Sequence, residues 1–256
     1  MRTGCVLMGL VLAVAGCDSG GSMQRLGAGY AALEQKQYET AVASADAVLR
    51  QSPGSAEALY LKGRGVYGRT KSDQARATAD INEARALYQR ALASSPSPQL
   101  QGLIYADLAN LAYQQEQYAV AETQWTQAHN LIERSDVRGV ILFQIARCRQ
   151  RLGKWADADK VYAQIGQSYP NTDLARQAAE KVGFTGFWVQ VGAYSRQADA
   201  DKVIAGLGGY RNQGLSIVRK PHNGHFLVMV GPKDYRGAKV LREQLAGTYK
   251  DAFLRP

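Results

Sequence analysis

One short pattern, an aromatic residue with an alanine three positions later, recurs along the middle of the chain. Its clearest copies are Tyr38 with Ala41, Tyr118 with Ala121, and Trp155 with Ala158. Residues three or four apart share one face of an α-helix, and each copy continues with apolar residues at that spacing. A second apolar helix pattern precedes each copy. Helix pairs of this kind bury their apolar faces only by stacking, so we expect an all-α solenoid over residues 23–183.

The repeats resemble the tetratricopeptide (TPR) repeat, a pair of antiparallel helices about 34 residues long. Small residues occupy the positions where the paired helices approach each other closely. They are Gly29, Gly63, Ala109 and Ala146 in the first helices and Ala41, Ala84, Ala121 and Ala158 in the second. The second copy departs from the pattern by roughly nine extra residues around 68–74. A capping helix is expected over residues 172–182, beginning at Thr172 or Asp173.

The TPR resemblance implies a groove that binds a partner protein, here a protein of the cell envelope. The alternative is a rigid spacer or an oligomerisation surface. Trp125, Trp155 and Tyr162 occupy positions in the core of the repeat, so we interpret them as structural.

The N-terminal residues have the features of an export signal. Arg2 precedes an apolar run over residues 6–14 that is too short to span a bilayer, and small residues follow it. The sequence Val14-Ala15-Gly16-Cys17 resembles the lipobox of bacterial lipoproteins. The resemblance implies a signal peptide over residues 1–16, acylation of Cys17 (diacylglycerol and palmitate), and a flexible tether over residues 17–22. The chain would then be anchored to a bacterial membrane through lipid and would face the periplasm. The alternatives are an ordinary signal peptide and a buried helix that happens to contain a cysteine.

The pattern changes from helical to alternating at a glycine-containing linker, residues 183–186. Strands are expected over residues 187–191, 215–219, 225–230 and 252–254. Helices begin after Ser195 and Asp234, the first ending at Gly208-Gly209 or at Gly214, and Asn223-Gly224 is a strong hairpin signal. We therefore predict a small α+β domain of order βαββαβ over residues 186–256, with a four-stranded antiparallel sheet and both helices on one face. Gly231-Pro232 is expected to end the third strand.

Three blocks in this segment resemble the SPOR (sporulation-related) domain. They are Trp188-Val189-Gln190-Val191-Gly192-Ala193-Tyr194-Ser195, Val228-Met229-Val230-Gly231-Pro232 and Asp251-Ala252-Phe253-Leu254. SPOR domains bind peptidoglycan, especially glycan strands that have lost their stem peptides. The resemblance therefore implies a cell-wall glycan as the ligand.

Strand alternation divides the side chains of this sheet between two faces. Val189, Val191, Ile217, Phe226, Val228 and Val230 are expected against the helices. The free face would then show Trp188, Gln190, Ser216, Val218, Leu227 and Met229, a mixture suited to sugar rings and hydroxyl groups. The family resemblance places the glutamine, Gln190, on the glycan-binding face, and Ser195 is the next candidate. Leu227 and Met229 stand where the family often has Arg or other polar residues.

Charge is concentrated in the same segment. Residues 186–256 contain 11 Lys and Arg against 5 Asp and Glu, which is six of the nine excess positive charges of the chain. Arg219 and Arg255, with Arg196 and Lys220, are candidates to contact the lactyl carboxylates of a stripped glycan strand. The alternative is a basic surface that serves only solubility.

We find no sequence pattern for a catalytic residue, a metal site or a cofactor. RNA-binding domains share the βαββαβ order, but Leu227 and Met229 replace the aromatic residues on which bases stack, so no nucleic-acid partner is expected. The leading hypothesis is a lipid-anchored protein that binds peptidoglycan and recruits a partner in division or wall remodelling. The alternative is a pilotin-like assembly scaffold for a pilus, secretion or outer-membrane machine.

Overall fold

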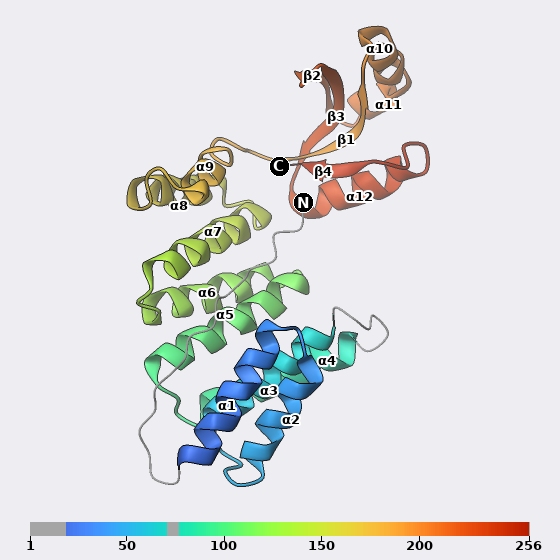
Figure 1. Ribbon diagram of the computed structural model, residues 1–256. Helices are drawn as coiled ribbons and strands as arrows, with labels where there is room; N and C mark the ends of the chain where they lie inside the picture. Colours follow the sequence, from blue (N-terminus) through green and yellow to red (C-terminus); the bar gives the residue numbers. More distant parts are fainter. Residues whose placement is uncertain (1–18, 71–76, 256) are drawn as a thin grey trace. The chain divides into compact units, whose positions relative to one another are not determined.

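The computed structural model describes residues 19–70 and 77–255 (Figure 1). The chain divides into two compact units, Met1–Ile141 and Leu142–Pro256. Cys17 and the expected signal peptide lie outside the described residues, as does most of the sequence in which the second repeat is longer.

Antiparallel helix pairs make up the region in which repeats were expected, which confirms the predicted all-α part of the fold. The helices are α1 (Ser19–Glu34), α2 (Tyr38–Leu49), α3 (Ala56–Arg69), α4 (Ala77–Ala93), α5 (Pro98–Gln114), α6 (Tyr118–Leu131), α7 (Ser135–Arg151), α8 (Trp155–Ser168) and α9 (Asp173–Ala179). Each odd-numbered helix from α1 to α5 packs against the helix that follows it.

Polar side chains fix where several of these helices begin. Ser55 accepts a hydrogen bond from the Ala58 amide at the start of α3, and Ser97 does the same for Leu100 in α5. Such caps satisfy amide groups that have no partner inside the first turn. Thr172 caps α9 in the same way, which confirms that Thr172 starts the short helix expected there.

Small residues allow the helices to approach as the repeat pattern requires. Ala41, Ala121 and Ala158 have no solvent exposure. Gly68 of α3 lies directly under the ring of Tyr38, the aromatic residue of the first pattern, and a Cβ atom at Gly68 would overlap that ring. The aromatic-alanine pattern therefore predicts the packing because the alanine is buried and the aromatic ring covers a neighbouring helix.

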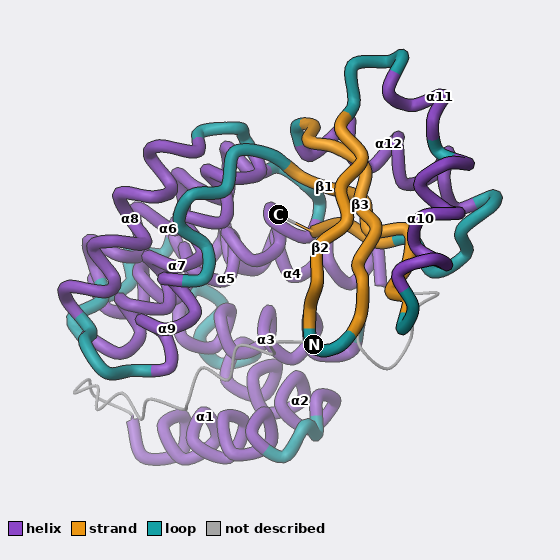
Figure 2. The backbone as a smooth tube through the Cα atoms, turned by 90° about the horizontal axis from the view of Figure 1, so that it is seen from above, coloured by secondary structure: helices purple, strands orange, loops and turns teal. Residues whose placement is uncertain are grey.

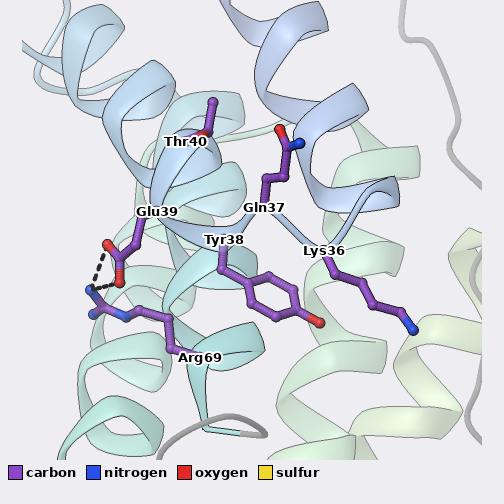
Figure 3. A pocket seen from close by; sticks show the side chains of 6 residues that line it. All are labelled: Lys36, Gln37, Tyr38, Glu39, Thr40 and Arg69. Carbon is purple, nitrogen blue, oxygen red and sulfur yellow. Dashed lines mark hydrogen bonds and ion pairs between the residues drawn. The ribbon is translucent and has the colours of Figure 1, made fainter.

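Arg69, at the end of α3, connects three helices of the first unit. Its guanidinium lies 3.4 Å from the carboxylate of Glu39 in α2, and 3.3 and 3.5 Å from those of Asp80 and Glu83 in α4. Asp80 is buried, so this ion pair compensates a charge that would be costly to bury alone. Figure 3 shows Glu39 and Arg69 facing each other at one side of an open cavity of about 300 Å³.

The C-terminal segment has the predicted order βαββαβ (Figure 1), and Figure 2 draws its strands in orange. Its elements are β1 (Phe187–Tyr194), α10 (Gln197–Gly206), α11 (Gly208–Arg211), β2 (Ser216–His222), β3 (His225–Lys233), α12 (Tyr235–Ala246) and β4 (Phe253–Arg255). All pairs are antiparallel and the strand order is β2-β3-β1-β4. All six side chains expected against the helices lie in or against one core, together with Leu207, Leu241 and Leu245.

Three local predictions are wrong. Strand β3 continues through Gly231-Pro232 to Lys233. Its pairing with β1 is irregular between Phe187 and Val189, so no backbone N–H is needed from Pro232, which has none. Ser195 does not cap α10: Arg196 occupies that position without a side-chain capping bond. The first helix also ends earlier than expected, at Gly206, and a separate short helix, α11, follows.

The close approach at Gly68 gives a test of the helix packing. We expect Gly68→Ala to lower the free energy of unfolding by about 1–3 kcal/mol, because the added methyl group overpacks against Tyr38. Gly27→Ala is the matched control: it lies in α1 with no atom within 4 Å of the added Cβ, so higher helix propensity should raise stability by about 0.5–1 kcal/mol. Urea unfolding of both variants measures this. Equal effects of the two substitutions would contradict the packing described.

Candidate functional site

Four side chains form a row across all four strands on the face of the sheet away from the helices. Val218 of β2 is the partner of Met229 of β3, Met229 is the partner of Gln190 of β1, and Gln190 is the partner of Phe253 of β4. Directly opposed residues in antiparallel strands point to the same face and lie within contact of one another. The register thus brings together three of the predicted site residues, Gln190, Val218 and Met229, with Phe253.

A second, adjacent row contains three more of the predicted site residues, Ser216, Trp188 and Arg255. Trp188 of β1 is the partner of Arg255 of β4, and Ser216 of β2 is the partner of Gly231 of β3. The indole ring of Trp188 lies against the backbone of Gly231, where a Cβ atom would be 3.1 Å from the ring. The lack of a side chain at Gly231 therefore gives Trp188 a place on this face.

The centre of this face is more closed than the sequence indicates. Gln190, Leu227 and Met229 are each only 5% exposed, so the expectation of a freely accessible row is wrong for these three. Each has a direct cross-strand neighbour on both sides: Gln190 lies between Met229 and Phe253, and Met229 between Val218 and Gln190. Directly opposed neighbours on a sheet cover part of one another's surface. Exposure is concentrated instead at the two edge strands, at Ser216 of β2 and at Phe253 of β4.

The buried amide of Gln190 is incompletely satisfied. Its side-chain oxygen is shielded from solvent and accepts no hydrogen bond within the described residues. A buried acceptor without a donor costs about 1–3 kcal/mol, and native proteins keep few of them. Gln190 therefore holds an acceptor at the middle of the face that a ligand with hydroxyl or amide N–H groups can satisfy.

Irregular pairing surrounds Gln190 on strand β1. The register shifts once between Phe187 and Val189 and again between Gln190 and Gly192, where one extra residue enters β1. Such bulges bend a strand and redirect its side chains. Val191 lies in the helix-facing core and Gln190 on the opposite face, as alternation places adjacent strand residues, and both are buried. The second bulge makes Val191 the extra residue between Gln190 and Gly192.

The structure separates the arginines that the sequence grouped together. Arg219 pairs in register with the core residue Val228, forms an ion pair with Asp201 of α10, and lies over the ring of Phe226. Arg219 and Val218 are adjacent in β2 and therefore point to opposite faces of the sheet. Arg219 lies on the helix-facing side, so its assignment to the glycan-binding face is wrong. Arg196 is paired with Asp199, whose hydrogen bonds raise the pKa of the guanidinium.

Arg255 remains on the candidate face. It is the partner of Trp188, and its guanidinium lies 5.4 Å from the centre of the Phe253 ring. Ser195, the second candidate on β1, follows the end of the strand and is exposed outside both rows. Nothing in the geometry brings Ser195 to Gln190.

Phe253 is the residue that sequence reasoning missed. It is 44% exposed, unusually high for a phenylalanine, and it is the direct partner of Gln190. The alternation of Phe253 with the core residue Leu254 was a signal that could have placed it on this face. A three-residue edge strand gives that signal little support from periodicity alone.

The face can hold a ligand by stacking on Phe253 and Trp188, by hydrogen bonds to Gln190 and Ser216, and by ion pairing with Arg255. Elsewhere in the described residues no group of three His, Cys, Asp or Glu side chains is arranged to hold a metal ion. No helix among residues 19–70 and 77–255 combines the length and apolar character needed to cross a bilayer. The cavity in Figure 3 has its arginine, Arg69, already engaged by carboxylates.

Comparison with known families matches two segments of the chain. Residues 183–256 match the SPOR domain, and residues 141–172 match a tetratricopeptide repeat. These domains are of binding and scaffold types. A SPOR domain indicates peptidoglycan binding and a location in the cell envelope, and TPR repeats indicate interaction with proteins. No curated protein gives a significant match to this sequence.

Solved structures with a similar course of the chain include TPR proteins. TTC0263, a thermophilic TPR protein of Thermus thermophilus, is 14% identical, with 64% of this chain and 82% of that chain covered and a TM-score of 0.52. YrrB, a TPR protein with an unusual peptide-binding site, is 18% identical over 62% of this chain and 84% of its own, with a TM-score of 0.47. Pseudomonas aeruginosa pilF is 16% identical over 90% of this chain and 93% of its own, with a TM-score of 0.48.

At this level of identity the likeness to TTC0263 establishes the helical fold alone, and the two lower scores support no argument. Together with the helix pairs and the βαββαβ sheet described above, the matches identify the architecture. The chain carries TPR-type helical repeats followed by a SPOR domain.

Proposed function

We propose that this chain is a lipid-anchored protein of the cell envelope that binds stripped peptidoglycan glycan strands through the outer face of its SPOR sheet. The helical repeats hold a protein partner, and the pair acts in cell division or wall remodelling. The observation that supports this most is the unpaired amide oxygen of Gln190, buried between Met229 and Phe253.

The chemistry of the face matches that of a glycan without stem peptides. Aromatic rings stack on the flat faces of sugars, and an amide can bond both hydroxyl and acetamido groups. Removing a stem peptide leaves a lactyl carboxylate on the sugar. Arg255 has no ion pair among the described residues and lies beside Phe253, so it offers the guanidinium for that carboxylate.

Lipid anchoring is supported by the residues that precede the described structure. The apolar run over residues 6–14 and the tetrapeptide ending at Cys17 resemble a lipoprotein signal. A lipid chain on Cys17 would attach the repeats to the membrane while the SPOR domain engages the wall. A partner held by the repeats would then be kept between the two.

Gln190→Leu tests the central residue of the site. The substitution keeps the approximate volume but removes the unpaired amide, so the stability of the chain should be unchanged or higher. Retention on amidase-treated sacculi should fall about 3- to 10-fold, the loss expected for one neutral hydrogen bond. Binding isotherms of the purified full chain, together with urea unfolding, measure both effects.

Gln244→Ala is the control for this experiment, since it removes an exposed glutamine from α12 on the other side of the sheet. Retention of Gln190→Leu equal to that of the unsubstituted chain would remove Gln190 from the site. An equal loss in Gln244→Ala would show that the effect is not specific to the face.

Phe253→Ala tests the contribution of the edge strand. Because the ring is only partly buried, stability should fall by about 1 kcal/mol or less, whereas losing a stacking surface should weaken glycan retention by about 2- to 10-fold. Val240→Ala is the matched control, because Val240 is 50% exposed on α12 and lies outside the face. If both variants bind like the unsubstituted chain, β4 is not part of the site.

Cys17→Ala tests the anchor. The unsubstituted chain, expressed in a bacterium with labelled palmitate, should incorporate label and sediment with membranes, and Cys17→Ala should do neither. Cys148→Ala, which changes a buried cysteine of the second unit, should behave like the unsubstituted chain. Unlabelled wild-type protein, or label that persists in Cys17→Ala, would contradict lipidation at this residue.

A further inference from the structure

A cation and three aromatic rings meet within the second compact unit, residues 142–256. Arg151, at the end of α7, lies 3.7 Å from the centre of the Tyr235 ring and 4.9 Å from that of Phe187. Phe187 is in turn 5.3 Å from Trp155, the first residue of α8, and 5.2 Å from Tyr235. We call these four residues the junction cluster.

The junction cluster explains a burial that the SPOR sheet itself does not. Phe187 is only 3% exposed, yet it is absent from the core that joins the sheet to α10 and α12. Its ring contacts are with Trp155, Arg151 and Tyr235. Two of these three belong to the helical repeat, so the repeat completes the burial of the first residue of β1.

The guanidinium of Arg151 is held mainly by its contacts with the aromatic rings. One of its terminal nitrogens, Nη1, is buried and makes no hydrogen bond within the described residues. A guanidinium placed over aromatic faces is stabilised by their electron density, and the attraction increases when water is excluded. The rings of Tyr235 and Phe187 therefore provide a favourable contact for the guanidinium, whose Nη1 has no hydrogen-bond acceptor within the described residues.

The segment that joins repeat and sheet is held as well. The Gly183 amide donates to both carboxylate oxygens of Asp159 in α8, at 3.1 and 3.2 Å. The Gln150 side chain donates to the Lys181 carbonyl and accepts from the Tyr162 hydroxyl. These bonds fix the backbone on the approach to β1, where the sequence indicated only a glycine-containing linker over residues 183–186.

We propose that the helices of the second unit that carry Arg151 and Trp155, namely the C-terminal part of α7 together with α8, are an integral part of the SPOR module. They dock through the junction cluster, so that residues 142–256 act as one unit. Phe187 and Tyr235 are the first residues of β1 and α12, so docking constrains both the sheet and its covering helix. Trp188 follows Phe187 directly. A partner on this helical pair is then held in a fixed orientation to the glycan-binding face, a consequence that rests on the proposed function.

A double-mutant cycle on the full chain tests the docking without any ligand. Arg151→Ala, Tyr235→Ala and the double variant are compared by urea unfolding and by hydrogen exchange of residues 183–190. The double variant should lose less stability than the two single variants combined, with a coupling of about 3- to 30-fold in the unfolding equilibrium. Exchange over residues 183–190 should accelerate in Arg151→Ala.

Arg176→Ala is the control, because it removes the same charge from the exposed surface of α9, where Arg176 pairs with Asp173 and lies outside the junction cluster. If Arg151→Ala unfolds the repeat, Arg151→Lys, which keeps the charge but not the planar group, replaces it in the cycle. Additive losses together with unchanged exchange over residues 183–190 would overturn the proposal.

Binding to amidase-treated sacculi separates this proposal from the proposed function. Arg151→Ala should reduce retention about 2- to 5-fold, because the start of β1, which positions Trp188, is then held less firmly. The coupling energy in the double-mutant cycle is measured independently of this binding. A coupled cycle in a chain that sacculi do not retain would leave the docking standing and refute the glycan function. An uncoupled cycle in a chain that sacculi do retain would refute the docking and leave the glycan function standing.

Discussion

The position of β1 between β3 and β4 is the constraint on which the C-terminal site depends. Pairing on both sides fixes Gln190 opposite Met229 and Phe253, and a register slip by one residue would exchange the two faces of the strand. The core prevents that slip, because Val189 and Val191 must both reach the helices. Alternation then places the polar, buried Gln190, between these valines in sequence, on the opposite face. The candidate face is thus a consequence of how the core is packed.

A buried acceptor without a donor is a cost that the fold does not need. The same row would be better satisfied with an apolar residue at Gln190, flanked as it is by Met229 and Phe253. The rest of the sheet follows the ordinary division of apolar and polar residues between core and surface. A local departure from that division is expected where a sequence is selected for binding as well as for stability.

Much of this architecture could be predicted from the sequence because it depends on periodicity. The alanines at helical spacing and the alternation of Val189, Val191, Val228 and Val230 report burial directly. The exposure of single side chains on the open face could not be predicted, since it depends on which residues the strand register places beside them. Arg219 was misplaced because net charge does not identify the face on which a residue lies. Phe253 had only the weak signal of alternation with Leu254 in a three-residue strand. The junction cluster joins distant segments, for which a single sequence has no signal.

The central claim is that the outer face of the SPOR sheet binds glycan strands without stem peptides. The most direct test compares retention of the purified full chain on sacculi before and after treatment with an amidase that removes stem peptides. The account predicts clearly greater retention after treatment, and competition by soluble stripped glycan. Retention that is equal on both preparations, or no greater than that of an unrelated basic protein, would contradict it.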